Sequence, residues 1–297
     1  MATLTDYLKL HFIVFLWGFT AVLGLLISIP SVEMVFYRTL LAAIGMGVVI
    51  LMAKGSFKAS RPDLVRMILI GFIVCVHWLS FFASARISNA SVSLVGFATN
   101  SLWAALLEPW LNGRQIKKFE LLLGLLVLAG LYIIFSFNFA YPLGLLLGIV
   151  SGFTAALFSV LNAKLVRRIE PNIITFYEMG GAFAATALVL PIYQNTWAVN
   201  ATLNLLPTSL DWLYIALLAW ACSVYAYTMA IHLMKKFSVF FIQLTLNLEP
   251  VYGIIMALLI LGEKEKMGLN FYLGTLIILT AVIAYPRLKS RFEKVAS

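Results

Sequence analysis

The chain has 297 residues, of which 63% are hydrophobic and 11% are charged. Ordinary soluble domains carry about 25% charged residues, so a water-soluble globule of this composition could not cover its own surface. Composition therefore excludes an ordinary soluble domain. The net charge of +9 would suggest nucleic-acid binding in a soluble protein, but in a membrane protein the positions of Lys and Arg relative to the membrane have to be examined first.

Runs of about 17 or more mostly apolar residues, the length that crosses a bilayer core, recur along the whole chain. We predict an all-α, polytopic membrane protein with ten transmembrane helices. In chain order the predicted spans are 8–28, 32–53, 64–84, 89–111, 119–137, 142–163, 172–192, 212–232, 239–261 and 270–286.

Lysine and arginine residues fall mostly on one side of this topology. Seventeen of the 21 lie on the side that holds both termini, three lie on the other side, and Arg38 lies within a span. Cytoplasmic loops are rich in Lys and Arg, so we expect both termini in the cytoplasm. Topology and contact with the lipid bilayer then account for the basic charge, and no nucleic-acid partner is expected.

Short sequence matches indicate that the chain contains one five-helix unit twice. Gly18–Ala21 of the first span reappears as Gly152–Ala155 of the sixth, and Phe36–Arg38 of the second span aligns with Phe176–Glu178 of the seventh. Because five is an odd number, the second unit enters the membrane from the opposite side. The two units are therefore inverted repeats.

The boundary between the repeats falls between the fifth and sixth spans. It assigns residues 1–138 to the first repeat and residues 139–297, with a short basic C-terminal tail, to the second. Two inverted halves can exchange conformations about one central site, which gives outward-open and inward-open states of similar energy. A duplication that built only a helical scaffold is the alternative.

The ninth span and the segment after it carry the motifs that resemble a known family. They read LEPVY at 248–252, LGE at 261–263 and YLGTLI at 272–277. Together with Trp17-Gly18 in the first span and Phe36–Arg38 in the second, these motifs resemble the EamA branch of the drug/metabolite transporter superfamily. The likeness extends over nearly the whole chain.

The resemblance implies two EamA repeats around a substrate cavity lined mainly by the first, third, fourth, sixth, eighth and ninth helices. Members of the family move amino acids, nucleotide-linked metabolites, cofactors and amphipathic toxins, so the substrate stays open. The likeness to bacterial exporters implies the bacterial plasma (inner) membrane. In one departure, the first repeat has Leu111-Asn112-Gly113 where an LGE turn would stand.

Ionisable residues at the bilayer centre are functional candidates, because burying a charge there costs at least ~2.5–3.5 kcal/mol on insertion scales. Glu249 lies about halfway along the ninth span, and Asn100 is the aligned residue of the fourth span. Pro250 leaves the carbonyl of Leu246 without its usual donor and predicts a kink. Glu249 either binds a substrate cation or a coupling proton, or is a buried structural carboxyl.

Arg38 and Glu178 occupy equivalent depths of the second and seventh spans, near opposite faces of the membrane. Such placement suggests two gates. Arg38 either binds a substrate carboxylate or a gate partner through its guanidinium fork, or it extends its long stem to the interface. For Glu178 the structural interpretation is favoured. The coupling or gating candidates are therefore Glu249, Arg38, Glu178 and Pro250.

Helical spacing selects candidate cavity residues from the many polar and aromatic side chains. Hydroxyl and amide groups that alternate with Trp and Phe would form an amphipathic cavity, suited to a partly apolar zwitterion or cation. Packing is the alternative role of each aromatic, and His77 is more often a hydrogen-bonded core residue than a proton carrier. The predicted cavity residues are Trp17, Thr20, Arg38, His77, Trp78, Phe81, Asn100, Trp103, Phe158, Asn162, Gln243, Asn247 and Glu249.

A glycine stripe at Gly144, Gly148 and Gly152 predicts close helix packing in the sixth span. Gly180 and Gly181 of the seventh span are the expected partner surface.

We therefore expect a secondary-active transporter, specifically an exporter of small metabolites such as amino acids or related amphipathic compounds, and not an enzyme. The sequence has no GxxxxGK[ST] loop, so ATP hydrolysis is not expected. The alternative is an intramembrane enzyme acting on lipid or peptide, but all three aspartates lie outside the spans or at their edges, and HExxH and GxSxG are absent. We expect no cofactor or metal, protons as the candidate coupling ion, and a monomer or weak homodimer.

Overall fold

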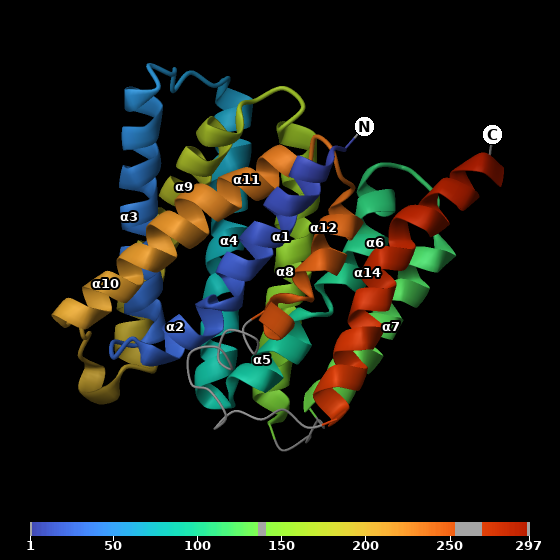
Figure 1. The fold of residues 1–297 in the computed structure, drawn as a ribbon. Coiled ribbons are helices and arrows are strands. Elements are labelled where there is room, and N and C mark those ends of the chain that lie inside the picture. Colours follow the sequence, from blue (N-terminus) through green and yellow to red (C-terminus); the bar gives the residue numbers. More distant parts are fainter. Residues whose placement is uncertain (1, 136–140, 253–268, 296–297) are drawn as a thin grey trace.

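The computed structural model describes residues 2–135, 141–252 and 269–295, and these residues form helices and connecting loops without strands. Apolar helices run between the two ends of a bundle (Figure 1). The all-α class predicted from the sequence is confirmed. The predicted repeat boundary at residues 138 and 139 and the LGE motif at 261–263 lie outside the described residues.

The five predicted spans of the first repeat appear as seven helices, because two of the spans are broken. The first span is interrupted at Phe19 and the fourth at Ala98 and Thr99, with no proline at either break. The helices are α1 (Leu4–Gly18), α2 (Thr20–Leu26), α3 (Ser31–Met52), α4 (Arg61–Ile87), α5 (Ala90–Phe97), α6 (Asn100–Leu111) and α7 (Lys118–Phe135).

The second repeat contains a π-helical segment in its third predicted span. This segment, η2, continues α10 into α11 without a break, and its wider turns shift the helical register. The elements are α8 (Pro142–Leu165), α9 (Pro171–Thr196), the 3-10 turn η1 (Val199–Ala201), α10 (Ser209–Leu217), η2 (Leu218–Tyr225), α11 (Ala226–Leu233), α12 (Val239–Leu246) and α14 (Leu269–Val295).

Local sequence explains where several of these helices begin. Pro142 and Pro171 occupy the first positions of α8 and α9, where the missing N–H costs no helical hydrogen bond and the fixed φ favours the helix. Ser60 and Thr208 cap α4 and α10, because each side chain accepts a hydrogen bond from the backbone three residues later. These signals place the helix starts within a few residues of the predicted spans.

Seven helices in the described residues are long and apolar enough to cross a membrane. They correspond to the first, second, third, sixth, seventh, eighth and tenth predicted spans. The fourth is split into α5 and α6, the fifth appears as the 18-residue α7, and the ninth continues into residues outside the description. The chain is thus a polytopic membrane protein, and the count of ten stays a prediction.

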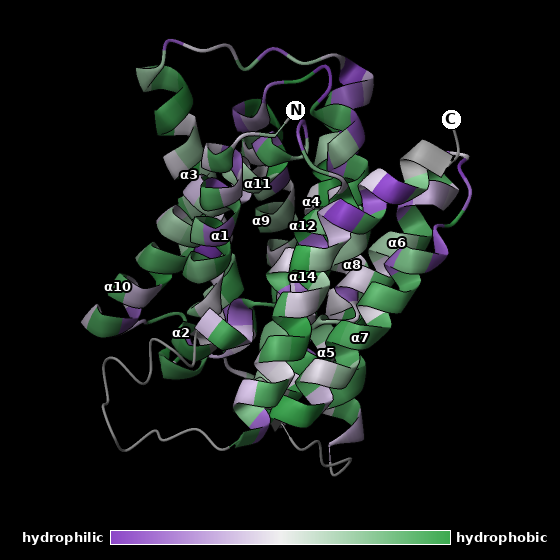
Figure 2. Ribbon diagram, turned by 45° about the vertical axis from the view of Figure 1, so that its right-hand side comes forward, coloured by the Kyte–Doolittle hydropathy of each residue, from purple (hydrophilic) through white to green (hydrophobic). Residues whose placement is uncertain are grey.

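The two termini lie at the same end of the bundle, which we call the terminal end (Figure 1). The connections from α3 to α4, from α6 to α7, from α8 to α9 and from α11 to α12 lie at this end too. Figure 2 shows hydrophilic residues gathered there, with hydrophobic residues along the helices. The fold therefore groups the basic loops at one end, as the charge count predicts.

Glycines bring helices of the two repeats into backbone contact. A Cβ on Gly96 of α5 would lie 2.7 Å from the Cα of Gly148 in α8, so the predicted close packing of the α8 stripe is confirmed. The predicted partner of the α8 stripe is wrong, because Gly181 of α9 packs against Ile68 of α4 and not against α8. A Cβ on Gly180 would have nothing within 4 Å.

Two carboxylates at equivalent positions connect the repeats, one at each end of the bundle. Asp63 and Asp211 each lie in the first turn of the helix that begins the third predicted span of a repeat. At the terminal end, Arg168 Nη2 donates to Asp63 Oδ1 at 2.6 Å. At the opposite end, the backbone N–H and the hydroxyl of Ser28 donate to Asp211 at 2.7 and 2.6 Å.

These contacts, which we call the cross-repeat ties, are themselves related by the repeat. Arg168 and Ser28 lie 140 residues apart, the same offset that aligns the second predicted span with the seventh. In each tie, the third span of one repeat therefore binds the loop between the first two spans of the other.

Candidate functional site

A pocket lies between helices of both repeats. The space open to the centre of a water molecule is about 70 Å³, enough for about five waters at roughly 10–15 Å³ each. Side chains from α1, α2, α3, α4, α5, α8, η2, α11 and α12 line it. The resemblance implied helices one, three, four, six, eight and nine, and the structure adds the second through Arg38.

Ten of the thirteen predicted cavity residues line this pocket, although they come from five of the predicted spans. Helical spacing and the repeat together selected them. They are Trp17, Thr20, Arg38, His77, Trp78, Phe81, Phe158, Asn162, Gln243 and Glu249.

Three predicted cavity residues, Asn100, Trp103 and Asn247, do not line the pocket. Asn247 donates to the hydroxyl of Ser101 at 3.2 Å. Trp103 packs edge-on against Phe153, with ring centroids 5.2 Å apart, and Asn100 is fully buried at the start of α6. For Asn100 and Trp103 the prediction assumed one continuous helical face, which the break between α5 and α6 interrupts, and Asn247 lies at the corresponding break after α12.

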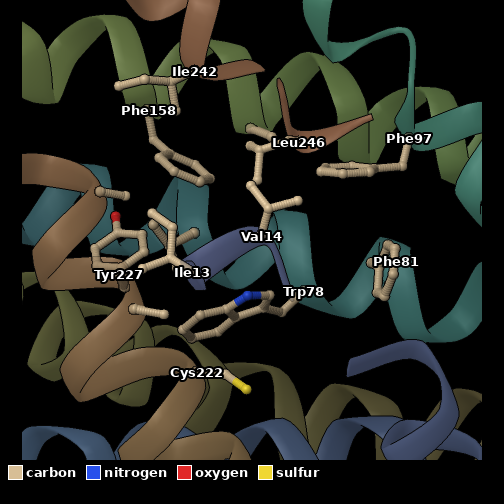
Figure 3. Packing of buried hydrophobic residues seen from close by; sticks show 14 of the residues in the cluster. Ile13, Val14, Trp78, Phe81, Phe97, Phe158, Cys222, Tyr227, Ile242 and Leu246 are labelled. Atoms are coloured by element: carbon tan, nitrogen blue, oxygen red, sulfur yellow. The ribbon is translucent and has the colours of Figure 1, made fainter. Parts of the chain in front are cut away.

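Aromatic rings from three helices form one wall of the pocket. Figure 3 shows Trp78 of α4, Phe158 of α8 and Tyr227 of α11 pointing toward a common space. The ring centroids of Trp78 and Tyr227 are 6.5 Å apart, and those of Phe158 and Tyr227 are 5.7 Å apart. Edge-on and tilted arrangements of this kind are favourable for aromatic pairs, so the wall is a packed unit.

Trp78 and Tyr227 occupy equivalent positions of the two repeats. They are 149 residues apart, the offset that also aligns Asn100 with Glu249. A residue can contact its own equivalent only close to the pseudo-two-fold axis. The pocket therefore lies on the axis that relates the inverted repeats.

Arg38 is 2% exposed and reaches the pocket from α3. Its Nε donates to the hydroxyl of Ser223 at 3.0 Å, and its guanidinium carbon lies 4.0 Å from the ring centroid of Trp78. This distance is typical of a cation–π contact. The interpretation that Arg38 extends toward the membrane interface is wrong, because the aromatic wall and η2 hold its head inside the bundle.

Glu178 is fully buried in α9, and its Oε2 accepts from Tyr227 at 2.7 Å and from Asn162 at 3.1 Å. It does not line the pocket, but both of its donors do. Arg38 therefore reaches the pocket from α3, whereas Glu178, on the equivalent helix α9, lies behind Tyr227 and Asn162.

Glu249 lines the pocket and is 4% exposed. It follows a break in the ninth predicted span, where α12 ends at Leu246 and Asn247 caps the helix. Pro250 is buried beside it. Since proline has no N–H to donate to the carbonyl four residues earlier, the end of α12 at Leu246 agrees with the kink that Pro250 predicts.

The break before Glu249 has an equivalent in the first repeat. There, α5 ends at Phe97, and Asn100 begins α6. Both half-helices thus end 149 residues apart, at Phe97 and Leu246, and both of these residues line the pocket. Interrupted helices at the centre of inverted repeats are typical of sites where a small solute is bound.

Two polar residues of the pocket also connect helices. His77 Nδ1 lies 2.9 Å from the hydroxyl of Ser151, and Gln243 Nε2 donates to the hydroxyl of Ser159 at 2.7 Å. Gln243 Oε1 is buried without a partner. Both residues therefore bind α8 while they line the pocket.

Sequence reasoning missed Tyr227 and Ser223, which form hydrogen bonds to Glu178 and to Arg38. Tyr227 could have been found, because the 149-residue offset leads from Trp78 directly to it. For Ser223 the sequence carries no such signal, because its position depends on the π-helical register of η2.

The sequence profile of the EamA-like transporter family matches residues 7–136 and 142–285. The chain belongs to this family. Each matched segment corresponds to one five-helix unit, so the two EamA repeats expected from the sequence are confirmed. The comparison with curated proteins gave no match.

A solved crystal structure aligns with 98% of this EamA protein and with 100% of its own chain, with a TM-score of 0.75 and 17% sequence identity. At this identity the likeness concerns the fold alone. Across the described residues of the EamA protein, no three His, Cys, Asp or Glu side chains come together as the ligands of a metal would.

Proposed function

We propose that this EamA protein is a secondary-active transporter that exports small amphipathic metabolites, such as amino acids or related compounds, by alternating access. The observation that carries the proposal is the position of the pocket on the pseudo-two-fold axis between the repeats, where Trp78 meets its equivalent Tyr227. A site on this axis keeps its place when the two halves exchange conformations.

The lining of the pocket supports a cargo with both polar and apolar parts. The aromatic wall offers apolar surface, Arg38 brings a cation, and Glu249 brings a carboxyl group. Carboxylates bind guanidinium groups bidentately, and ammonium groups are attracted to carboxylates and aromatic faces. A small zwitterion therefore matches the pocket better than a purely apolar or a polyanionic solute.

Glu249 is the proposed coupling group, with protons as the coupling ion. It is the carboxyl group that lines the pocket, so the cargo and a proton can compete for it directly. Glu178 lies behind Tyr227 and Asn162 and accepts hydrogen bonds from both, so its role in the proposal is to hold the pocket wall. Arg38 and Pro250 complete the proposed gating set.

The proposed setting is the bacterial inner membrane, with both termini cytoplasmic and a monomer or weak homodimer as the working unit. The grouping of basic loops at the terminal end supports this orientation, because cytoplasmic loops are rich in Lys and Arg. Export then means passage from the terminal end to the opposite end.

Counterflow in proteoliposomes tests the proposal. Vesicles loaded with one unlabelled compound from a panel of amino acids and nucleosides receive traces of the labelled compound outside. We expect transient accumulation for one chemical class, with amino acids first, and none in protein-free vesicles. Absence of exchange for every class would overturn the proposal, and conversion of added lipid or peptide into products would favour an intramembrane enzyme.

A further inference from the structure

The guanidinium group of Arg38 is held on two sides. Its Nε donates to Ser223 of η2 at 3.0 Å, and the group lies over the ring of Trp78, with 4.0 Å between the guanidinium carbon and the ring centroid. Within the described ranges, Nε is the one nitrogen of Arg38 with a hydrogen-bond partner. The edge formed by Nη1 and Nη2 is therefore free at the pocket that Arg38 lines.

Ser223 can act only as an acceptor toward Arg38. A serine hydroxyl has one proton and two lone pairs, and the proton of Ser223 is donated to the carbonyl of Leu218 at 2.9 Å. Leu218 lies five residues earlier, which is the spacing of a π-helical turn. The turn therefore fixes the hydroxyl with a lone pair directed at Nε, since an arginine nitrogen can only donate.

We propose that Ser223 is a positioning residue that orients Arg38 so that its Nη edge binds the carboxylate end of the cargo. This inference rests on the proposed function and adds the residue that orients Arg38 and the edge of the guanidinium group that the cargo meets. With Nε bound to Ser223 and the guanidinium carbon over Trp78, the two remaining nitrogens present a planar fork that matches the two oxygens of a carboxylate.

Binding to the purified protein in detergent tests the inference without transport. The probes are three matched pairs: acetate and acetamide, benzoate and benzamide, and L-leucine and L-leucinamide. We expect the wild type to bind at least one carboxylate about tenfold more tightly than its amide, the scale of one charge-assisted hydrogen bond. Calorimetric titration gives the ratio of the two affinities.

The variants Ser223→Ala and Arg38→Lys are expected to lower this ratio by about tenfold, because the first releases Nε and the second removes the fork. Adding Ser223→Ala to Arg38→Lys should change the ratio no further, since both act on one interaction. The matched control is Ser80→Ala. Ser80 is a buried hydroxyl of α4 outside the pocket and donates to carbonyls of its own helix.

An unchanged ratio in Ser223→Ala, an equal loss in Ser80→Ala, or no preference for any carboxylate in the wild type would overturn the inference. Thermal unfolding of each variant shows whether it is folded, and Arg38→Lys provides the second variant if Ser223→Ala is not. Carboxylate selectivity without counterflow would refute the proposed transport function but not the role of Ser223. Counterflow together with an unchanged carboxylate-to-amide affinity ratio in Ser223→Ala would refute the role of Ser223 but not the proposed transport function.

Discussion

Arg38, Glu178 and Glu249 are buried at or beside the pocket, and each has a different environment. Arg38 is held by Ser223 and Trp78, and Glu178 accepts from two donors on its Oε2. Glu249 lines the pocket itself, and its carboxyl group makes no hydrogen bond to any other residue in the described part of the chain. Cargo or water is therefore the natural partner of Glu249, whereas Glu178 is bound by Tyr227 and Asn162 through Oε2, and its Oε1 is buried without a partner.

The substitution Glu249→Gln tests this difference. It keeps the shape of the side chain and removes its ability to exchange a proton, so we expect a folded protein that loses flux driven by a pH gradient. Uptake into proteoliposomes with and without an imposed gradient is the measurement. A response to the gradient equal to that of the wild type would rule Glu249 out as the coupling group.

Glu120→Gln is the matched control for Glu249→Gln. Glu120 is also 4% exposed, but it lies outside the pocket, beside Lys117 and the hydroxyl of Tyr285. We expect the flux of this variant to respond to the gradient as the wild type does. A loss in both variants would indicate a general effect of removing a buried carboxyl.

Tyr227→Phe removes one of the two donors to Glu178 and leaves the rest of the ring in the aromatic wall. Loss of a hydrogen bond to a buried carboxyl group should lower the free energy of unfolding by about 1–3 kcal/mol. Tyr177→Phe is the comparison. The Tyr177 hydroxyl donates to the backbone carbonyl of Phe57, and loss of this hydrogen bond should lower the free energy of unfolding by about 0.5–1.5 kcal/mol. Unfolding in detergent measures both, and an equal or larger loss in Tyr177→Phe would contradict the prediction.

At the scale of the elements, the contact between α5 and α8 depends on glycine. A Cβ on Gly96 would come within 3.0 Å of backbone atoms of α8, which cannot move aside as a side chain can. We expect Gly96→Ala to destabilise the protein by about 1–3 kcal/mol through overpacking. Thermal unfolding and the yield of folded protein in detergent are the measurements.

Gly180→Ala is the matched control in α9, because a Cβ there meets nothing within 4 Å. Alanine is a better helix former than glycine by about 1 kcal/mol, so this variant should be neutral or slightly more stable. If both variants were equally destabilised, the loss would come from glycine replacement in general and not from the contact between α5 and α8.

The sequence predicts the continuous helices well, because their ends carry local signals. The spans predicted at 32–53 and 142–163 appear as α3 (Ser31–Met52) and α8 (Pro142–Leu165). It predicts neither the break at Ala98 and Thr99 nor η2, because no proline marks them and their geometry depends on neighbouring helices. A hydropathy average depends only on residue types, so it does not distinguish an α-helical turn from a π-helical turn.

The same limit explains the candidate site. Residues on unbroken helical faces, such as His77 and Phe158, were found by their spacing, and they line the pocket. Trp103 was placed on a face that the break interrupts, and Ser223 was missed because a π-helical turn aims its hydroxyl at Arg38. Substrate, direction of transport and ion coupling depend on how several conformations of the protein bind solutes, and the pattern of residue types does not specify those conformations.

At the scale of the whole molecule, the cross-repeat ties hold both ends of the bundle together. The terminal end has an ion pair whose Arg168 side chain is 52% exposed. At the opposite end, Asp211 is 2% exposed and accepts two bonds from Ser28 and two from Thr208. Exposed ion pairs contribute about 0.2–1 kcal/mol, whereas hydrogen bonds to a charged group contribute about 1.5–3 kcal/mol.

Removing each tie should expose the pocket from its own end. Cys222 lines the pocket and is a native reporter, whereas Cys75 lies between α4 and α9 and would be replaced by serine. In oriented vesicles, we expect Arg168→Gln to raise labelling of Cys222 by an impermeant thiol reagent added at the terminal end, by up to about fivefold. Ser28→Ala should raise labelling from the opposite end by about tenfold.

Both substitutions leave the caps of α4 and α10 intact, because Ser60 and Thr208 still bind the carboxylates. A change in labelling from the same end in both variants would contradict the assignment of one tie to each end. Unchanged labelling in both would mean that the ties stay formed when the pocket opens.

Because one cross-repeat tie is an exposed ion pair and the other is a buried hydrogen-bonded contact, salt concentration should affect mainly the tie at the terminal end. High salt, at about 1 M, weakens exposed ion pairs and screens buried contacts much less, so it weakens the contact between Arg168 and Asp63 and leaves the enclosed contact between Ser28 and Asp211 nearly unchanged. Raising ionic strength should therefore favour the conformation that is open at the terminal end. Two repeats with equivalent contacts of unequal chemistry thus leave the molecule with ends that respond differently to the same change of solvent.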